Sequence, residues 1–264
     1  MIHPTAIIHS KARLDSTVQV GPGVVIDEGV ELGAECIVGP HVYLTGLTTI
    51  GAHNRFHAGS VIGDAPQDFK YDGTPTRLRI GVDNVFREHV TVHRSTKTDE
   101  ETLIGSHNYL MANSHVGHNS RLGDHVILAN GVLLGGYAQV EDRAFLGGNC
   151  LVHQFTRVGT LAMMQGGAAI SQDLPPFTIV HDVNRLCGLN IVGLRRAGIV
   201  SADRLELKRL YRFVILRGKN LRAAGVQGEA AFSGEPARKF LRFLAESKRG
   251  VCTPSADSTV GEDE

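Results

Sequence analysis

The sequence predicts a mainly β fold, a left-handed parallel β-helix of hexapeptide repeats with a C-terminal α-helical domain. An aliphatic residue or Met occupies every sixth position from Ile104 to Ile170. This period is neither that of a helix nor that of an isolated strand. A short fixed repeat is typical of a solenoid, in which stacked repeats bury one continuous core. After Pro175 and Pro176 the apolar spacing becomes helical, so we expect the solenoid to end there.

The same repeat begins at Ile2 and runs to Ile62, often with Gly directly after the aliphatic residue. We expect these glycines to provide the backbone angles that a corner needs. Two stretches break the repeat, 64–79 with its prolines and charges and 95–102 with its polar residues. Both are predicted to be loops that leave the solenoid. The β-helix is therefore assigned to residues 1–173.

Residues 174–250 are assigned to a helical domain with helices over 190–199, 201–217 and 235–247. Ser201 is the expected N-cap of the second helix, and Gly218 and Gly250 are the expected helix ends. The last residues, 251–264, are small, polar and acidic, and are predicted to be disordered.

Charge is balanced over the chain, with 27 basic and 27 acidic side chains, but it is unevenly distributed. Residues 1–173 hold 12 basic and 17 acidic side chains, whereas 174–250 hold 15 basic and 6 acidic. The basic module indicates either an acidic macromolecular partner or solvated helix faces. The four Cys are isolated, so neither a disulfide framework nor a metal site is expected. No targeting signal or membrane-length apolar run is present, which favours a cytoplasmic protein with no integral membrane segment.

Coils of about eighteen residues place side chains eighteen positions apart in adjacent coils, about 4.8 Å from each other. His118, Gly136 and Gln154 then form one column, and His153 belongs to the adjoining column. Three polar or Gly-rich motifs therefore converge on one corner of the prism. A prism edge is barely concave, so we expect the loops, a second subunit or both to supply the missing wall.

Several motifs occur in the order seen in a known family: Gln67-Asp68-Phe69-Lys70-Tyr71, Val92-His93-Arg94, Asn113-Ser114-His115-Val116-Gly117-His118, Ile127-Leu128-Ala129-Asn130, Val152-His153-Gln154-Phe155, Gln172-Asp173-Leu174-Pro175-Pro176, Gly188-Leu189-Asn190 and Gly193-Leu194-Arg195-Arg196. With them the chain resembles the acyl-[acyl-carrier-protein]–UDP-N-acetylglucosamine O-acyltransferases, which begin lipid A synthesis. The resemblance implies a homotrimer with active sites between subunits, a (3R)-hydroxyacyl donor on acyl carrier protein, a UDP-sugar acceptor and no cofactor. It implies no nucleic-acid partner, and the acidic carrier protein would suit the basic module.

The resemblance also implies roles for individual residues. His118 matches the general base, and Gly136 matches the backbone donor to the oxyanion, which in comparable acyl transfers is worth about 3 kcal/mol. The other matches are sugar contacts at Asp68 and Lys70, acceptor-pocket residues His115, His153 and Gln154, nucleotide contacts at Asn190 and Arg196, and an acyl-chain stop at Gly166. Tyr137 is also assigned to the acceptor pocket, although it differs from the family residue.

Four positions depart from the family pattern. Asn119 stands where an Asp usually follows the catalytic His, Tyr137 where a His usually follows the oxyanion Gly, Ala197 where an Arg is common, and Val192 where an acid is common. Two alternatives therefore remain open: N-acylation of a UDP-amino-sugar analogue, and a non-catalytic trimeric binding protein of the same fold. A third, zinc bound by His115 and His118 at a subunit interface, has no place for the family motifs.

Overall fold

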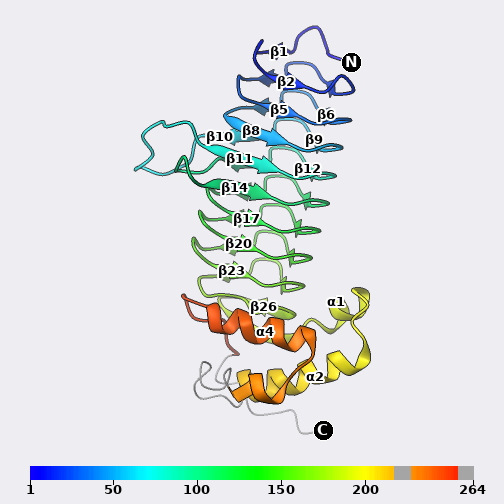
Figure 1. The fold of residues 1–264 in the computed structure, drawn as a ribbon, viewed down its shortest axis with the longest axis vertical. Coiled ribbons are helices and arrows are strands. Elements are labelled where there is room, and N and C mark those ends of the chain that lie inside the picture. The colour runs from blue at the N-terminus through cyan, green and yellow to red at the C-terminus, as the bar shows by residue number, and fades with distance from the viewer. Residues whose placement is uncertain (217–226, 255–264) are drawn as a thin grey trace.

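The chain forms a three-sided solenoid of stacked parallel β-sheets, with helices packed at its C-terminal end (Figure 1). The computed structural model describes residues 1–216 and 227–254. The long loop after β10 (Val61–Asp64) projects from one side of the solenoid, and α1 (Ile191–Arg196) lies near the opposite end from the N-terminus. Within these residues, no helix is long and apolar enough to cross a membrane.

Over the described residues, the strands belong to three sheets with nine, eight and ten members. The nine-stranded sheet contains β1 (Ile7–Ile8), β4 (Val25–Ile26), β7 (Tyr43–Leu44), β10, β13 (Thr91–His93), β16 (His115–Val116), β19 (Leu133–Leu134), β22 (Leu151–Val152) and β25 (Ala169–Ile170). The eight-stranded sheet contains β2 (Arg13–Leu14), β5 (Glu31–Leu32), β8 (Leu47–Ile50), β11 (Arg77–Ile80), β14 (Glu101–Ile104), β17 (Arg121–Leu122), β20 (Gln139–Val140) and β23 (Arg157–Val158). The ten-stranded sheet contains β3 (Gln19–Val20), β6 (Ile37–Val38), β9 (Arg55–Phe56), β12 (Val85–Phe86), β15 (Tyr109–Leu110), β18 (Ile127–Leu128), β21 (Phe145–Leu146), β24 (Met163–Met164), β26 (Thr178–His181) and β27 (Arg185–Leu189).

The core is a stack of inward-facing side chains, one from each short strand. Leu110, Leu128 and Leu146 are fully buried in successive coils of the ten-stranded sheet. The rings of Phe56 and Phe86 stack with centroids 4.8 Å apart, which is the separation of neighbouring strands. The predicted six-residue period therefore separates one face of a coil from the next, and each face contributes one continuous apolar column.

Strand pairing shows where extra residues enter the coil. Phe145 pairs with Met163, eighteen positions on, but Val61 pairs with Thr91 and Thr91 with His115. The first interruption therefore adds twelve residues to a coil and the second adds six. The loops end earlier than predicted, because β11 begins at Arg77 and β14 at Glu101.

The corner glycines act differently from our expectation. Gly33 does not have a positive φ; instead, a Cβ there would lie 2.7 Å from the carbonyl carbon of Gly51 in the next coil. The left-handed residue comes two positions later, as at Glu35 with φ of 55° and Asn119 with φ of 59°. Close approach of successive coils, rather than backbone angle, therefore favours Gly directly after the inward residue.

The solenoid continues beyond the prolines, contrary to the predicted boundary at residue 173. Leu174 forms a parallel bridge with Val158, and Pro175 and Pro176 are buried. Strand β26 then pairs in parallel with β24, and β27 pairs antiparallel with β26. The antiparallel hairpin, rather than the proline pair, ends the sheet.

The helices are α1, α2 (Ser201–Tyr211), a π-helical segment (Arg212–Leu216), residues 227–231 and α4 (Glu235–Glu246). The N-cap of α2 is Val200 rather than Ser201, and α4 ends before Gly250 at its C-cap Ser247. Arg217 and Gly218 lie outside the described residues, as do 255–264 of the predicted disordered tail. The start of that tail is ordered, since Val251 bridges to Asp173 and Thr253 to Arg185.

Candidate active site

His118 lies at the corner between the nine-stranded and eight-stranded sheets, directly after β16. The pairing of His115 with Leu133, and of Leu133 with Leu151, places Gly136 and Gln154 at the same corner in the next two coils. All three residues line a pocket of about 600 Å³. Its other lining residues are Gln67, His93, His115, Gly117, Leu133, Leu134, Gly135, Leu151, Val152, His153, Ala169, Ile170, Ser171 and Val183.

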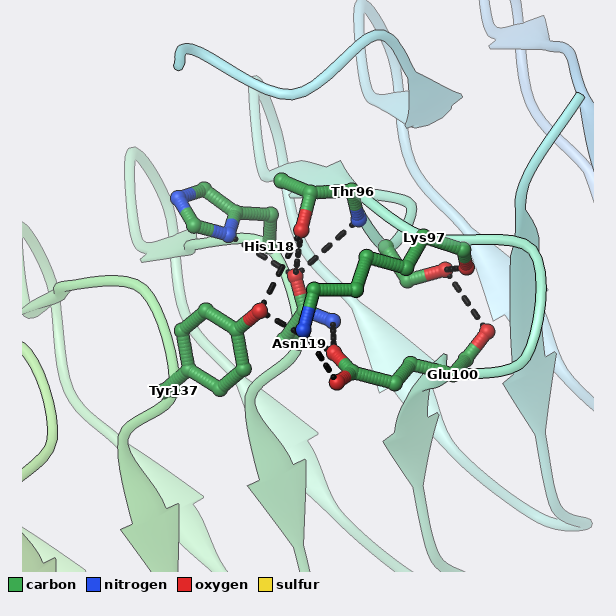
Figure 2. Close-up of polar contacts among 7 residues, drawn as sticks. Thr96, Lys97, Glu100, His118, Asn119 and Tyr137 are labelled. Atoms are coloured by element: carbon green, nitrogen blue, oxygen red, sulfur yellow. Dashed lines mark hydrogen bonds and ion pairs between the residues drawn. The ribbon is translucent and has the colours of Figure 1, made fainter. Parts of the chain in front are cut away.

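The imidazole of His118 is held by Asn119, whose Oδ1 lies 2.9 Å from His118 Nδ1 (Figure 2). The same Oδ1 accepts hydrogen bonds from the backbone N–H and the hydroxyl of Thr96, each at 3.0 Å. An oxygen that already accepts a backbone N–H must also accept from the imidazole, so Nδ1 carries the proton. The lone pair of His118 is then on Nε2, which is the arrangement that a general base requires.

Glu100 closes this arrangement from the second loop (Figure 2). Its Oε2 accepts from Asn119 Nδ2 at 2.6 Å and from the Tyr137 hydroxyl at 3.0 Å. Its Oε1 accepts from Lys97 Nζ at 3.0 Å. The Tyr137 ring also meets the His118 ring edge to face, with centroids 5.5 Å apart. The loop 94–100 therefore fixes both residues that flank the imidazole.

Gly136 lies against the working edge of the imidazole. A Cβ on Gly136 would lie 2.6 Å from His118 Nε2 and 2.5 Å from Cε1, so no larger residue fits without moving the ring. Its N–H makes no hydrogen bond to any residue that the structure describes, although its carbonyl accepts from Phe155 N–H. A free N–H beside a potential base is the donor that a developing oxyanion would need.

Two further histidines beside His118 are held neutral. Burial, together with the neighbouring His93 and His118, lowers the pKa of His115 to about 4. Burial also lowers the pKa of His93, whose ring meets that of His115 edge to face at 4.8 Å. The His115 Nδ1 lies 2.7 Å from the hydroxyl of Thr91. Both imidazoles therefore present neutral, polar edges to the pocket at pH 7.

We predict that folding stability falls between pH 6.5 and pH 4 because of His115. The unfolded chain binds a proton at this residue near pH 6.5, whereas the native state binds it only near pH 4, so acid favours the unfolded state. Over that window the loss is about 3 kcal/mol. Urea unfolding of His115→Asn at pH 7.5 and 4.5 should show a correspondingly smaller loss than wild type, while His3→Asn at an exposed site matches wild type. An equal acid loss in His115→Asn would contradict this assignment.

The structure brings most of the predicted site residues together. His115, His118, Gly136, His153 and Gln154 line one pocket, and Tyr137 contacts the imidazole from the adjacent coil. Asp68 and Lys70 lie on the first loop, of which Gln67 reaches the pocket lining. The first loop therefore borders the pocket through Gln67, and the sugar contacts of Asp68 and Lys70 stay a prediction.

Three predicted residues lie elsewhere in the protomer. Gly166 lies at the corner between β24 of the ten-stranded sheet and β25 of the nine-stranded sheet. His118 is at the other corner of the nine-stranded face. Asn190 caps α1 by accepting from Gly193 N–H at 2.9 Å, and its Nδ2 donates to the Leu161 carbonyl. Arg196 is exposed at the end of the same helix. One chain alone does not bring these residues to the His118 pocket.

Thr96 and Glu100 were not singled out as site residues from the sequence. The signal that could have found them is the length of the second interruption. Since Thr91 pairs with His115, the chain after β13 leaves the solenoid at the corner occupied by His118 one coil later. A six-residue insertion at that point must pass beside the imidazole.

Comparisons with known proteins agree with this architecture. Residues 173–252 match the family model described as UDP N-acetylglucosamine O-acyltransferase, domain 2, and residues 101–136 match the bacterial transferase hexapeptide model. An acyl-[acyl-carrier-protein]–UDP-N-acetylglucosamine O-acyltransferase of Gloeothece citriformis is 46% identical, over 93% of this chain and 90% of its own. One of Agrobacterium fabrum is 36% identical over 96% of both chains.

Solved structures give the same result. The UDP-N-acetylglucosamine acyltransferase of Francisella novicida superposes with a TM-score of 0.95 at 31% identity, covering 99% of this chain and 97% of its own. That of Arabidopsis gives a TM-score of 0.84 at 31% identity, covering 96% and 100%. The shared sequence and the shared fold, a left-handed β-helix followed by C-terminal helices, extend over nearly the whole chain. The protein therefore belongs to the acyl-[acyl-carrier-protein]–UDP-N-acetylglucosamine O-acyltransferase family.

Proposed function

We propose that the protein transfers a (3R)-hydroxyacyl chain from acyl carrier protein to the 3-hydroxyl of UDP-N-acetylglucosamine. This is the first step of lipid A biosynthesis, and we assign it to the cytoplasm. The observation that carries the proposal is the position of the His118 imidazole, whose Nδ1–H donates to Asn119 Oδ1 and whose Nε2 lies beside Gly136. The family relationship supplies the substrate class.

The reaction follows from this geometry. The sugar 3-hydroxyl oxygen attacks the thioester carbonyl carbon while its proton passes to His118 Nε2. The carbonyl oxygen gains the negative charge and accepts a hydrogen bond from Gly136 N–H. When the tetrahedral intermediate collapses, the carbon–sulfur bond breaks and the carrier thiolate takes the proton from His118. The products are the ester and the free carrier thiol, with the enzyme unchanged.

We further propose a homotrimer with the active sites between subunits. One face of the pocket is the nine-stranded sheet, which exposes Leu133 at 45% and Leu151 at 46%. Val183, which bridges to Ala169 at the end of that sheet, is exposed at 64%. Apolar side chains this exposed around a polar corner favour coverage by another protein surface. A second copy would bring the opposite edge of its own sheet, with Gly166 as the acyl-chain stop. It would also bring α1 and its N-cap, where Asn190 and Arg196 are the proposed nucleotide contacts.

The acyl carrier protein is proposed to dock on the basic C-terminal module. Residues 174–250 carry fifteen basic and six acidic side chains, and α4 presents Arg238, Lys239 and Arg242. An acidic carrier would be steered to such a surface by long-range attraction. The solenoid has the opposite charge balance, so an acidic carrier is expected to bind at the helical end rather than along the sides of the solenoid.

Acyl transfer from (3R)-hydroxyacyl carrier protein to UDP-N-acetylglucosamine, run beside its 3-amino analogue, tests the proposal. We expect an ester product with the hydroxyl sugar. Product with the amino sugar alone would identify an N-acyltransferase, a reaction to which the neutral Asn119 beside His118 would be suited because an amine needs less help from a base. No product with either sugar, from a folded trimer, would favour the non-catalytic binding protein.

A further inference from the structure

We infer that Glu100 is the positioning carboxylate of this site and supplies, through Asn119, the negative charge that stabilises the His118 imidazolium. The inference rests on the proposed role of His118 as general base. It assigns a function to the second loop, 94–100, and makes Asn119, Tyr137 and Glu100 one interdependent group. The residues that carry it are drawn together in Figure 2.

The orientation of the Asn119 amide is fixed from both sides. Its oxygen accepts from Thr96 N–H, which can only donate, and its nitrogen donates to a carboxylate of Glu100, which can only accept. Asn119 is also 5% exposed, and its backbone N–H donates to the Thr102 hydroxyl at 2.7 Å. The amide group therefore cannot flip. Its oxygen faces the imidazole of His118, and its nitrogen faces the carboxylate of Glu100.

The carboxylate is held by three donors. Asn119 Nδ2, the Tyr137 hydroxyl and Lys97 Nζ all bond to it, at 2.6, 3.0 and 3.0 Å. Two of these donors share Oε2, which faces the imidazole side of the loop. Tyr137 in turn packs on Phe155, with ring centroids 4.9 Å apart, so the tyrosine cannot swing away freely. The negative charge of Glu100 is thus held in a fixed place, and Asn119 alone separates it from the His118 imidazole.

This placement explains why Asn119 and Tyr137 occur together. A carboxylate at position 119 would lie beside that of Glu100, at the 2.6 Å contact that Asn119 Nδ2 now makes, and like charges at that distance repel strongly. A neutral amide instead donates to Glu100 through Nδ2 and accepts from the imidazole through Oδ1, so it links the two groups without repulsion. Tyr137 then supplies the second donor that Glu100 Oε2 receives.

The first test is Glu100→Gln, which keeps the shape of the side chain and removes its charge. We expect kcat to fall roughly tenfold, because protonation of His118 in the transition state loses its counter-charge, with the KM for the UDP sugar within about twofold. The acid limb of the pH–rate profile should also move to lower pH, because the imidazolium form of His118 loses its counter-charge. Asp99→Asn, one residue earlier and exposed, is the matched control and should change neither.

The second test moves the charge from one residue to the next. Asn119→Asp alone should be impaired, because two adjacent carboxylates must compete for one proton. In the double variant Asn119→Asp, Glu100→Gln, the new amide at position 100 can donate to the new carboxylate at position 119, which then lies directly beside His118. We expect this double variant to recover most of the activity and the acid limb of wild type.

The outcomes separate this inference from the proposed function. If His118→Ala retained full activity, the general-base role would be wrong and the inference would fall with it. If His118→Ala were inactive while Glu100→Gln kept the wild-type kcat and pH profile, the general-base role of His118 would stand and the positioning role of Glu100 would be wrong. A double variant no better than Glu100→Gln, with wild-type melting temperature and oligomeric state, would also overturn the inference.

Discussion

Replacing His118 with alanine is expected to lower kcat roughly 10³-fold while leaving the fold intact. The variant removes the only proton acceptor that our mechanism places at the sugar 3-hydroxyl. The residue is at a corner and only half-buried, so the apolar columns that stabilise the solenoid are untouched. Steady-state rates with UDP-N-acetylglucosamine, together with thermal unfolding, check both parts.

His57→Ala is a suitable control for this experiment, since His57 is another corner histidine that lies outside the pocket and pairs with Glu88 at 3.7 Å. It should have the wild-type rate. A loss of less than tenfold for His118→Ala, with a wild-type control, would mean that another group takes the proton.

Gly136→Ala is expected to lower kcat by roughly 10²-fold, for a steric reason. The added methyl would lie 2.5 Å from His118 Cε1, so the ring must move away from its bond with Asn119. The approach of the substrate carbonyl to Gly136 N–H would be hindered by the same methyl group. The measurement is kcat and KM with both substrates, beside the urea midpoint.

Gly148→Ala provides the matched comparison, because among the described residues a Cβ there would have only the Asn130 carbonyl oxygen within 4 Å, at 3.5 Å. Its activity should be close to wild type. Equal and small effects of the two substitutions would show that the contact between Gly136 and the imidazole does not matter for the reaction.

The fold was predictable because the residues of the solenoid core recur at a fixed interval in the sequence. Leu110, Leu128 and Leu146 are spaced by one coil and stack as that spacing requires. The last part of the solenoid was missed because Thr178–His181 follows two prolines, and neither the prolines nor a four-residue strand preserves the six-residue phase. Those prolines are buried in the turn between Leu174 and β26, and the sheet continues after them.

The site was predictable only where each coil has eighteen residues and no loop interrupts it. It placed His118, Gly136 and Gln154 at one corner, as the structure has them. Glu100 lies in a loop whose conformation no period determines, so its bond to Asn119 could not be foreseen. Asn119 and Tyr137 consequently seemed to weaken the site, although each is a partner of the carboxylate.

The pH dependence of kcat/KM with the hydroxyl sugar, measured for wild type and for the residual activity of His118→Ala, is the most direct test of the account. We predict that the wild-type rate falls about tenfold per pH unit on the acid side, as for loss of one base, and that this limb is absent from the variant. The same acid limb in His118→Ala would contradict the central claim that His118 is the general base.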